Sequence, residues 1–98
     1  MEEKELVDCL KALSDYNRLK IVKMLKNGEL CGCRLLTEFN FTQPTLSHHM
    51  KLLCDCGLLN DRKEGKWHHY SINSEKFQKL IDALSEYKWL FIQDDVAW

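Results

Sequence analysis

A chain of 98 residues in which 45% of the side chains are hydrophobic and 30% are charged has the composition of one folded domain, so we expect residues 1–98 to form a single domain. The net charge of −1 excludes a histone-like binder, and a domain this small buries only about 60 to 65% of its unfolded surface, which favours a second copy as partner. No run of roughly 20 apolar residues is present, and the acidic start Met1–Glu5 does not fit a secretory signal, so we expect a cytoplasmic protein with no membrane partner.

Two amphipathic helices are predicted first. The first ends near residues 14–15 and carries its apolar side chains at helical spacing: Leu6, Cys9, Leu10 and Leu13. The second begins at a cap provided by Asp15 or Asn17, ends at Asn27–Gly28, and is expected to bury Leu19, Val22, Met24 and Leu25.

A helix-turn-helix is predicted next. Residues 29–33 connect to a short helix over 34–39, and Asn40 and Phe41 form the turn. Thr42 is a good N-cap, Pro44 lies in the first turn where a missing N–H costs nothing, and Gly57 ends the second helix. Two helices joined by a tight turn are typical of this DNA-binding motif.

A hairpin and a final helix complete the expected fold. Residues 58–63 and 67–72 favour strands around a loop over 64–66, which is typical of a wing, and Ser74 is expected to cap a helix that runs to about Ile92. The broad apolar arc of that helix favours pairing with a second protomer over covering a small core: Phe77, Leu80, Ile81, Leu84, Tyr87, Leu90 and Phe91, with Trp89 and Trp98. We therefore predict a mainly α fold with a small β-hairpin wing, a winged helix-turn-helix homodimer with N- and C-terminal dimerisation helices.

Cys31 and Cys33 stand shortly before the predicted recognition helix. In a reducing cytosol, closely spaced thiols are more typical of metal ligands or redox sensors than of disulfides. Side chains two apart in a regular helix point to nearly opposite faces, so both sulfurs can hold one ion only if the helix start at Cys33 is non-helical or unwound. We expect binding there to distort the first helix of the motif and misalign the second; the alternative is two half-buried thiols with no such role.

The other three cysteines have weaker assignments. Cys54 and Cys56 would form a structural zinc site with the first pair only if four thiolates converged, yet positions i and i+2 of a helix diverge, so Cys56 is expected to pack at the helix end. Cys9 lies on the apolar stripe of the first helix and is expected in the core. It is also the candidate for a third thiolate, from either protomer.

The recognition helix is expected to present polar side chains to DNA: Gln43, Thr45, Ser47, His48 and Lys51. In the wing, Arg62, Lys63 and Lys66 suit phosphate or minor-groove contacts. Ordinary solvated surface is the alternative for each of these residues. Leu46, Met50 and Leu53 are expected in the core and His49 as an inward, hydrogen-bonded histidine. With few cations, the predicted salt dependence corresponds to about four or five phosphate contacts per protomer.

Four segments carry a resemblance to a known family: residues 13–19 (LSDYNRL), 29–33 (ELCGC), 43–50 (QPTLSHHM) and 57–67 (GLLNDRKEGKW). They resemble the ArsR/SmtB family of metal-sensing winged-helix repressors, and most of all its arsenical-resistance repressors, over about residues 6–90. The resemblance implies a homodimer on palindromic, double-stranded operator DNA that leaves when metal or metalloid binds. It also implies arsenite or antimonite as an inducer held by Cys31 and Cys33, with no catalytic cofactor.

The chain departs from that family's pattern at two positions. Leu36 stands where arsenic sensors often carry a third cysteine, and Arg34 replaces a common acidic residue, which places a cation beside the dithiol and favours thiolate. The final helix has no histidine, which removes the paired site of the family's zinc sensors. An alternative keeps the DNA module and makes the pair a sensor of cadmium, lead or zinc, or of oxidants and reactive sulfur.

Other classes of function fit less well. The sequence has no Cys-x-x-Cys pair, no glycine-rich phosphate loop and no nucleophile–base arrangement, which argues against an enzyme. A winged helix that binds only protein would leave residues 43–51 facing solvent and would show no DNA binding.

Overall fold

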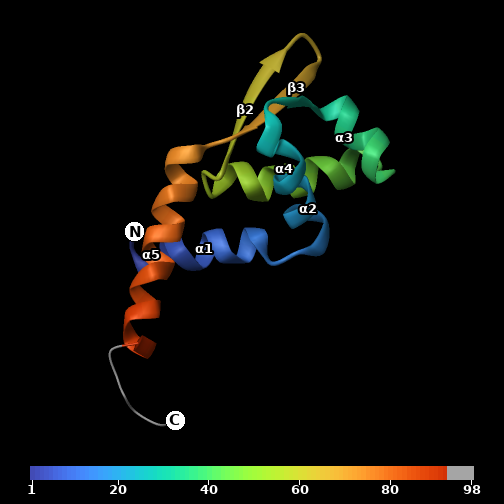
Figure 1. Cartoon of the computed structure of the whole chain (residues 1–98). Coiled ribbons are helices and arrows are strands. Elements are labelled where there is room, and N and C mark those ends of the chain that lie inside the picture. Colours follow the sequence, from blue (N-terminus) through green and yellow to red (C-terminus); the bar gives the residue numbers. More distant parts are fainter. Residues whose placement is uncertain (93–98) are drawn as a thin grey trace.

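The computed structural model describes residues 1–92, and the side chains of residues 1–88. Its elements follow the chain as α1 (Glu3–Leu13), α2 (Tyr16–Met24), a 3-10 turn (Leu25–Asn27), β1 (Leu30–Cys31), α3 (Gly32–Phe39), α4 (Gln43–Asp55), β2 (Leu59–Glu64), β3 (Trp67–Ile72) and α5 (Ser74–Ile92). Helix α4 crosses the middle of the molecule, with the β2–β3 hairpin projecting on one side and α1 and α5 crossing at the other end (Figure 1). The predicted mainly α fold with a hairpin wing is confirmed. No helix within residues 1–92 is both long enough and apolar enough to cross a bilayer.

Side-chain caps fix where the helices begin. Asp15 caps α2, because its Oδ2 accepts the N–H groups of Asn17 and Arg18, each at 3.0 Å. Thr42 caps α4 by accepting the Thr45 N–H at 3.3 Å. The prediction that Ser74 caps α5 is wrong: Asn73 Oδ1 accepts the Lys76 N–H at 3.2 Å, so the cap lies one residue earlier and Ser74 is already helical.

The described strands form one antiparallel sheet in the order β1-β3-β2. The predicted hairpin is confirmed, but β1 was missed, because a strand of two residues is too short to show an alternating pattern. In β1, Leu30 lies opposite Tyr70 and Cys31 opposite His69. The cysteine-bearing segment is therefore an edge strand of the wing.

Two apolar clusters hold the helices together. The larger joins α2, α3, α4 and the sheet and includes Ile21, Leu25, Leu35, Leu46, Met50 and Leu53. The smaller lies between α1 and α5 and includes Leu6, Cys9, Leu58, Leu80 and Ala83. The expectation that Leu19 is buried is wrong: it is 56% exposed, whereas Ile21, two positions or about 200° further round the helix, is fully buried.

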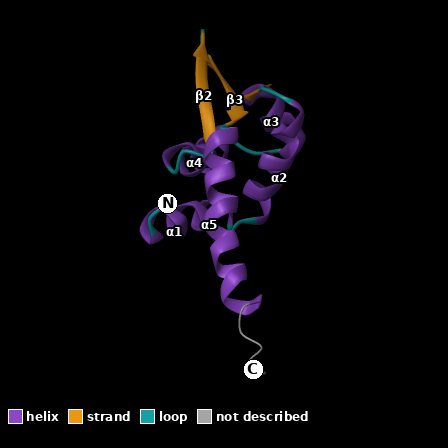
Figure 2. Ribbon diagram, turned by 60° about the vertical axis from the view of Figure 1, so that its left-hand side comes forward, coloured by secondary structure: helices purple, strands orange, loops and turns teal. Residues whose placement is uncertain are grey.

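Helices α1 and α5 cross at one end of the molecule, in both views (Figures 1 and 2). Lys76 of α5 forms an ion pair with Glu5 of α1 beside the smaller cluster. Several large apolar side chains of these two helices remain exposed: Val7, Leu10, Ile81, Leu84 and Tyr87. The other members of the predicted apolar arc, Trp89, Leu90, Phe91 and Trp98, lie outside the described side chains.

Candidate functional site

Helix α4 has one buried and one exposed face. Leu46, Met50 and Leu53 are buried, as predicted, because they recur at helical spacing and pack into the larger cluster. The five polar residues assigned to DNA lie on the remaining, exposed surface: Gln43, Thr45, Ser47, His48 and Lys51. Lys51 also forms an ion pair with Asp55 one turn further along, at 2.9 Å.

His49 points inward, as predicted, and is only 8% exposed. Its Nδ1 lies 3.1 Å from Arg18 Nη1, and Arg18 Nε donates to the carbonyl of Ala12 at 2.7 Å. Because a guanidinium only donates, Nδ1 must accept, so the imidazole is neutral and carries its proton on Nε2. Burial lowers the pKa of His49, which favours the same neutral form. Arg18, to which the sequence analysis gave no role of its own, thus joins the end of α1 to the recognition helix.

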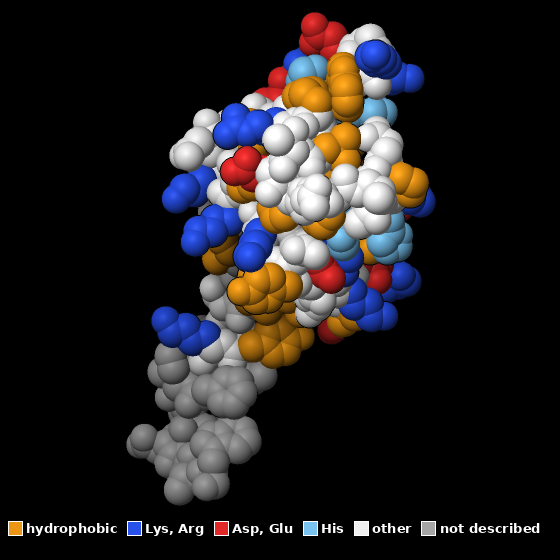
Figure 3. All heavy atoms as spheres, turned by 90° about the vertical axis from the view of Figure 1, so that its right-hand side faces the viewer, with side chains coloured by type: hydrophobic (Ala, Val, Ile, Leu, Met, Phe, Trp, Pro, Cys, Tyr) orange, Lys and Arg blue, Asp and Glu red, His pale blue; other side chains and the backbone are white. Residues whose placement is uncertain are grey.

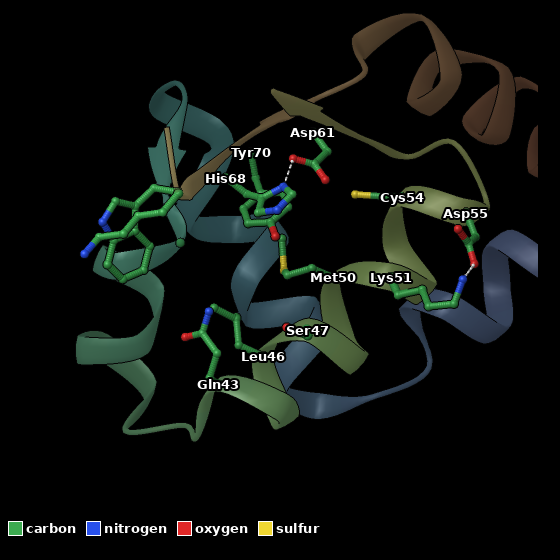
Figure 4. Close-up of a pocket in the computed structure, with 13 residues that line it drawn as sticks. Gln43, Leu46, Ser47, Met50, Lys51, Cys54, Asp55, Asp61, His68 and Tyr70 are labelled. Carbon is green, nitrogen blue, oxygen red and sulfur yellow. Dashed lines mark hydrogen bonds and ion pairs between the residues drawn. The ribbon is translucent and has the colours of Figure 1, made fainter. Parts of the chain in front are cut away.

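A groove of about 290 Å³ lies between α4 and the wing. Gln43, Ser47 and Lys51 line it from α4, and Lys66, Trp67 and His68 line it from the wing. Figure 4 shows the labelled α4 side chains and those of Asp61, His68 and Tyr70 around this hollow, with His68 Nδ1 2.6 Å from Asp61 Oδ1. The recognition helix and the wing therefore border one concave surface.

The cations predicted to contact DNA differ in their surroundings. Lys63 and Lys66 are exposed. Arg62 is instead paired with two carboxylates: its Nη2 lies 2.6 Å from Glu29 Oε1, and its Nη1 lies 2.6 Å from Glu64 Oε2. On the face seen from the side of α3, Lys and Arg side chains are spread around the edges rather than gathered in one patch (Figure 3). This distribution suits separate contacts to phosphates rather than one basic surface.

Cys31 and Cys33 meet at the start of α3. Cys31 is the N-cap residue, with extended backbone (φ −70°, ψ 143°), and its sulfur accepts the Cys33 N–H at 3.3 Å. The structure pairs the two sulfurs as a disulfide, with 5.2 Å between the Cα atoms, whereas the sequence favoured free thiols. For both sulfurs to hold one ion, the sequence predicts a non-helical start, and the extended backbone of Cys31 provides one. That ion binding distorts α3 stays a prediction. Cys31 precedes the helix, so its side chain is free to turn towards that of Cys33 in the first turn.

The remaining cysteines do not join this pair. Cys9 is fully buried in the smaller cluster and donates its S–H to the carbonyl of Cys56 at 3.6 Å, so within one protomer it is a core residue. Cys56 packs at the end of α4, as predicted, and donates to the carbonyl of Leu53 at 3.3 Å. Within residues 1–92, no group of three or more His, Cys, Asp or Glu side chains is arranged to hold a metal ion, which argues against the four-thiolate zinc site. Leu36 packs against the larger cluster.

Comparisons with known proteins agree with this geometry. The model of the bacterial regulatory proteins of the arsR family matches residues 15–61. The chain is 49% identical over 85 residues to an arsenical resistance operon repressor of Staphylococcus aureus, covering 87% of this chain and 82% of that relative.

Solved structures show the same architecture. An ArsR family transcriptional regulator superposes with a TM-score of 0.81 at 25% identity, covering 89% of this chain and 96% of that one. The homodimeric winged helix-turn-helix domain of a possible ArsR-family regulator from Mycobacterium bovis superposes with a TM-score of 0.70 at 21% identity, covering 97% and 89%, and supports the fold alone. The resemblance seen in the sequence is confirmed. The chain belongs to the ArsR family of bacterial regulatory proteins, and it is a transcriptional regulator rather than an enzyme.

Proposed function

We propose that this protein is an operator-binding repressor that is released when trivalent arsenic or antimony is coordinated by the thiolates of Cys31 and Cys33. The observation that carries the proposal is the convergence of these two sulfurs at the N-terminus of α3, the first helix of the helix-turn-helix. Soft, thiophilic centres select thiolate over carboxylate or imidazole. The reduced pair is the binding form, because a disulfide has no thiolate to offer.

The operator is contacted from both sides of the groove between α4 and the wing. On α4, Gln43 is positioned to read an adenine edge, and Thr45, Ser47 and His48 contact base edges or phosphates. Lys51, Lys63 and Lys66 contact phosphates and fix the register of the protein on the duplex, whereas Arg62 is held by Glu29 and Glu64. The exposed positions of these side chains support the assignment.

A second copy of the chain covers the exposed apolar side chains of α1 and α5. Val7, Leu10, Ile81, Leu84 and Tyr87 all lie on these two helices and remain exposed in one protomer. Large apolar side chains exposed together on two packed helices are typical of an interface. Two protomers related by a two-fold axis would present two recognition helices to a palindromic site.

The residue between the two cysteines is placed to pass a change at the thiols to α4. Gly32 is buried, and a Cβ added there would lie 3.5 Å from the carbonyl oxygen of His68 and from the Tyr70 ring, and 3.8 Å from Leu46 of α4. Movement of this segment when an ion is clamped therefore presses on both the recognition helix and strand β3. The difference in operator affinity between the empty and loaded forms is the coupling free energy between the two sites.

Operator binding by the reduced wild type and by the variants Cys31→Ser and Cys33→Ser, with and without arsenite, tests the proposal. We expect arsenite to release the wild type, and both variants to bind the operator but to stay bound when arsenite is added. The variant Cys54→Ser, which removes a thiol outside the pair, is the matched control and should respond as the wild type does.

Two results would contradict the proposal: a loaded wild type that holds its operator as tightly as the empty one, or a serine variant that is still released. Cadmium and peroxide are tested side by side with arsenite. If cadmium or peroxide releases the protein from the operator and arsenite does not, then the inducer is cadmium or an oxidant, and the assignment of the DNA-binding module still holds.

A further inference from the structure

One face of the wing sheet carries a row of side chains that starts at the dithiol. Cys31 of β1 lies opposite His69 of β3, and His69 lies opposite Arg62 of β2. Residues directly opposite one another in antiparallel strands project from the same face. Glu29 lies just before β1, and its contact with Arg62 brings it to the same row. The dithiol and the middle of the outer strand β2 are thus connected across the sheet.

A two-pronged ion pair closes this row. The Arg62 guanidinium donates from Nη2 to Glu29 Oε1 at 2.6 Å and from Nε to Glu29 Oε2 at 3.1 Å. Its remaining Nη1 donates to Glu64 Oε2 at 2.6 Å. Two parallel hydrogen bonds between a planar guanidinium and a carboxylate fix orientation as well as distance.

We propose that the Glu29–Arg62 pair transmits the loading of Cys31 and Cys33 to the wing, with Glu29 and Arg62 acting as positioning residues. This inference rests on the proposed function of the dithiol. Strand β1 has only two residues, so a displacement of Cys31 when both sulfurs grip an ion moves Glu29 with it. The planar pair with Arg62 tolerates little rotation, so this movement pulls on strand β2 through the intact pair. The pull changes how Lys63 and Lys66 approach DNA.

The wing route is distinct from the route through Gly32. Gly32 has no Cβ, so this segment must first close the space that a side chain would fill before it presses on Leu46 or Tyr70. The Glu29–Arg62 pair consists instead of directional, charge-assisted hydrogen bonds between residues 33 positions apart. We therefore assign to the Glu29–Arg62 pair a part of the coupling free energy between the dithiol and the operator, in addition to the part that passes through the recognition helix.

The variant Glu29→Gln tests the inference, because it preserves the size of the side chain and removes the charge. The matched control is Glu64→Gln, which removes the other carboxylate on Arg62 without touching the cysteine segment. Three quantities are measured on each reduced, full-length protein: operator affinity without arsenite, operator affinity at saturating arsenite, and arsenite affinity without DNA.

We expect Glu29→Gln to bind arsenite and, without arsenite, the operator within about twofold of the wild type, while the ratio of the two operator affinities falls roughly threefold to tenfold. Glu64→Gln should keep the wild-type ratio. Hydrogen exchange of peptides from residues 59–72 measures the effect of arsenite on the wing in the absence of DNA. Arsenite should change the exchange of these peptides in the wild type and in Glu64→Gln, but much less in Glu29→Gln.

The possible failures are separable. A wild type that arsenite releases, together with a Glu29→Gln variant that it releases equally well, would overturn this inference alone. Equal loss of release in both variants would also overturn it, because the effect would then belong to the charge around Arg62 and not to the cysteine segment. A wild type that ignores arsenite would overturn the proposed function and this inference together.

Discussion

The cysteines of this protein lie in two regions with opposite properties. At the dithiol end, defined by residues 29–33, Cys33 is exposed and Cys31 is half-buried on an edge strand. At the α1–α5 end, Cys9 is fully buried beside Cys56 in an apolar cluster. Burial raises the pKa of Cys9 to about 11, and it does the same to Cys54 in the groove beside α4. The same residue type is therefore available for chemistry at one end and serves packing at the other.

Thiol alkylation should show this contrast with the largest effect. In the reduced protein at pH 7.5, we expect iodoacetamide to modify Cys33 at least about a hundredfold faster than Cys9, because a pKa two units above the ordinary value leaves about a hundredfold less thiolate. Peptide mass spectrometry at a series of times gives both rates. Similar rates for the two cysteines in folded protein would break the comparison.

The α1–α5 end is expected to serve assembly as well as packing. Replacing Ile81, which is 52% exposed on α5, by Asp should raise the dimer dissociation constant by about tenfold to a hundredfold, because burial of that side chain contributes roughly 1.5–3 kcal/mol and a charge opposes it. The matched control is Leu19→Asp, since Leu19 is similarly exposed on α2. Sedimentation of both variants over a range of concentrations measures the effect. Equal weakening by the two substitutions would argue against an α5 interface.

Stability should also separate the two regions. Cys9→Ser places a hydroxyl in an apolar cluster and should lower the free energy of unfolding by about 1–2 kcal/mol while leaving the response to arsenite intact. Cys33→Ser, at an exposed position, should change it by less than about 0.5 kcal/mol and abolish the response. Urea unfolding at one fixed protein concentration makes the comparison, because dimer stability depends on concentration. A reversed order of stability would contradict the assignment of the two regions.

The buried imidazole of His49 is expected to have a smaller effect, on the pH dependence of stability. Because burial lowers the pKa of His49, the unfolded chain binds a proton at this imidazole more readily than the folded chain does. The contribution of neutral His49 to the free energy of unfolding is therefore fully present above about pH 6.5 and is lost as the pH falls from there through the folded pKa. Arg18 opposes protonation, as does the neighbouring His48, whereas Asp15 favours it. His49→Gln should flatten the dependence of the urea midpoint between pH 7.5 and 5.5. An unchanged slope in that variant would assign the dependence to other histidines.

Much of the fold could be predicted because its patterns are local. The period of apolar residues located α1 and α4, and Thr42, Pro44, Gly57 and Gly65 marked the ends and turns. The misses came from places where local pattern is weak or ambiguous. Strand β1 is too short to alternate, and two adjacent polar residues, Asn73 and Ser74, both suit a helix cap.

The sequence predicted which single residues belong to the candidate site better than it predicted the contacts between them. Helical spacing alone separated the inward Leu46 and Met50 from the outward Gln43 and Ser47. The pairing of Arg62 with Glu29 joins residues 33 positions apart, and that of Arg18 with His49 joins residues 31 apart, so both depend on how the elements pack. The helix boundary beside Cys31 and Cys33 was missed by two residues, since α3 begins at Gly32 and not at residue 34.

The Arg18 guanidinium has a consequence for how two protomers would be spaced on a duplex. It holds the carbonyl of Ala12 at the end of α1 and also the imidazole of His49 in α4. Successive major grooves on one side of B-form DNA lie about 34–36 Å apart. In a dimer joined through α1 and α5, the two α4 helices must be separated by that distance. The joint formed by this half-buried arginine thus sets part of the distance between the two recognition helices in the assembled protein.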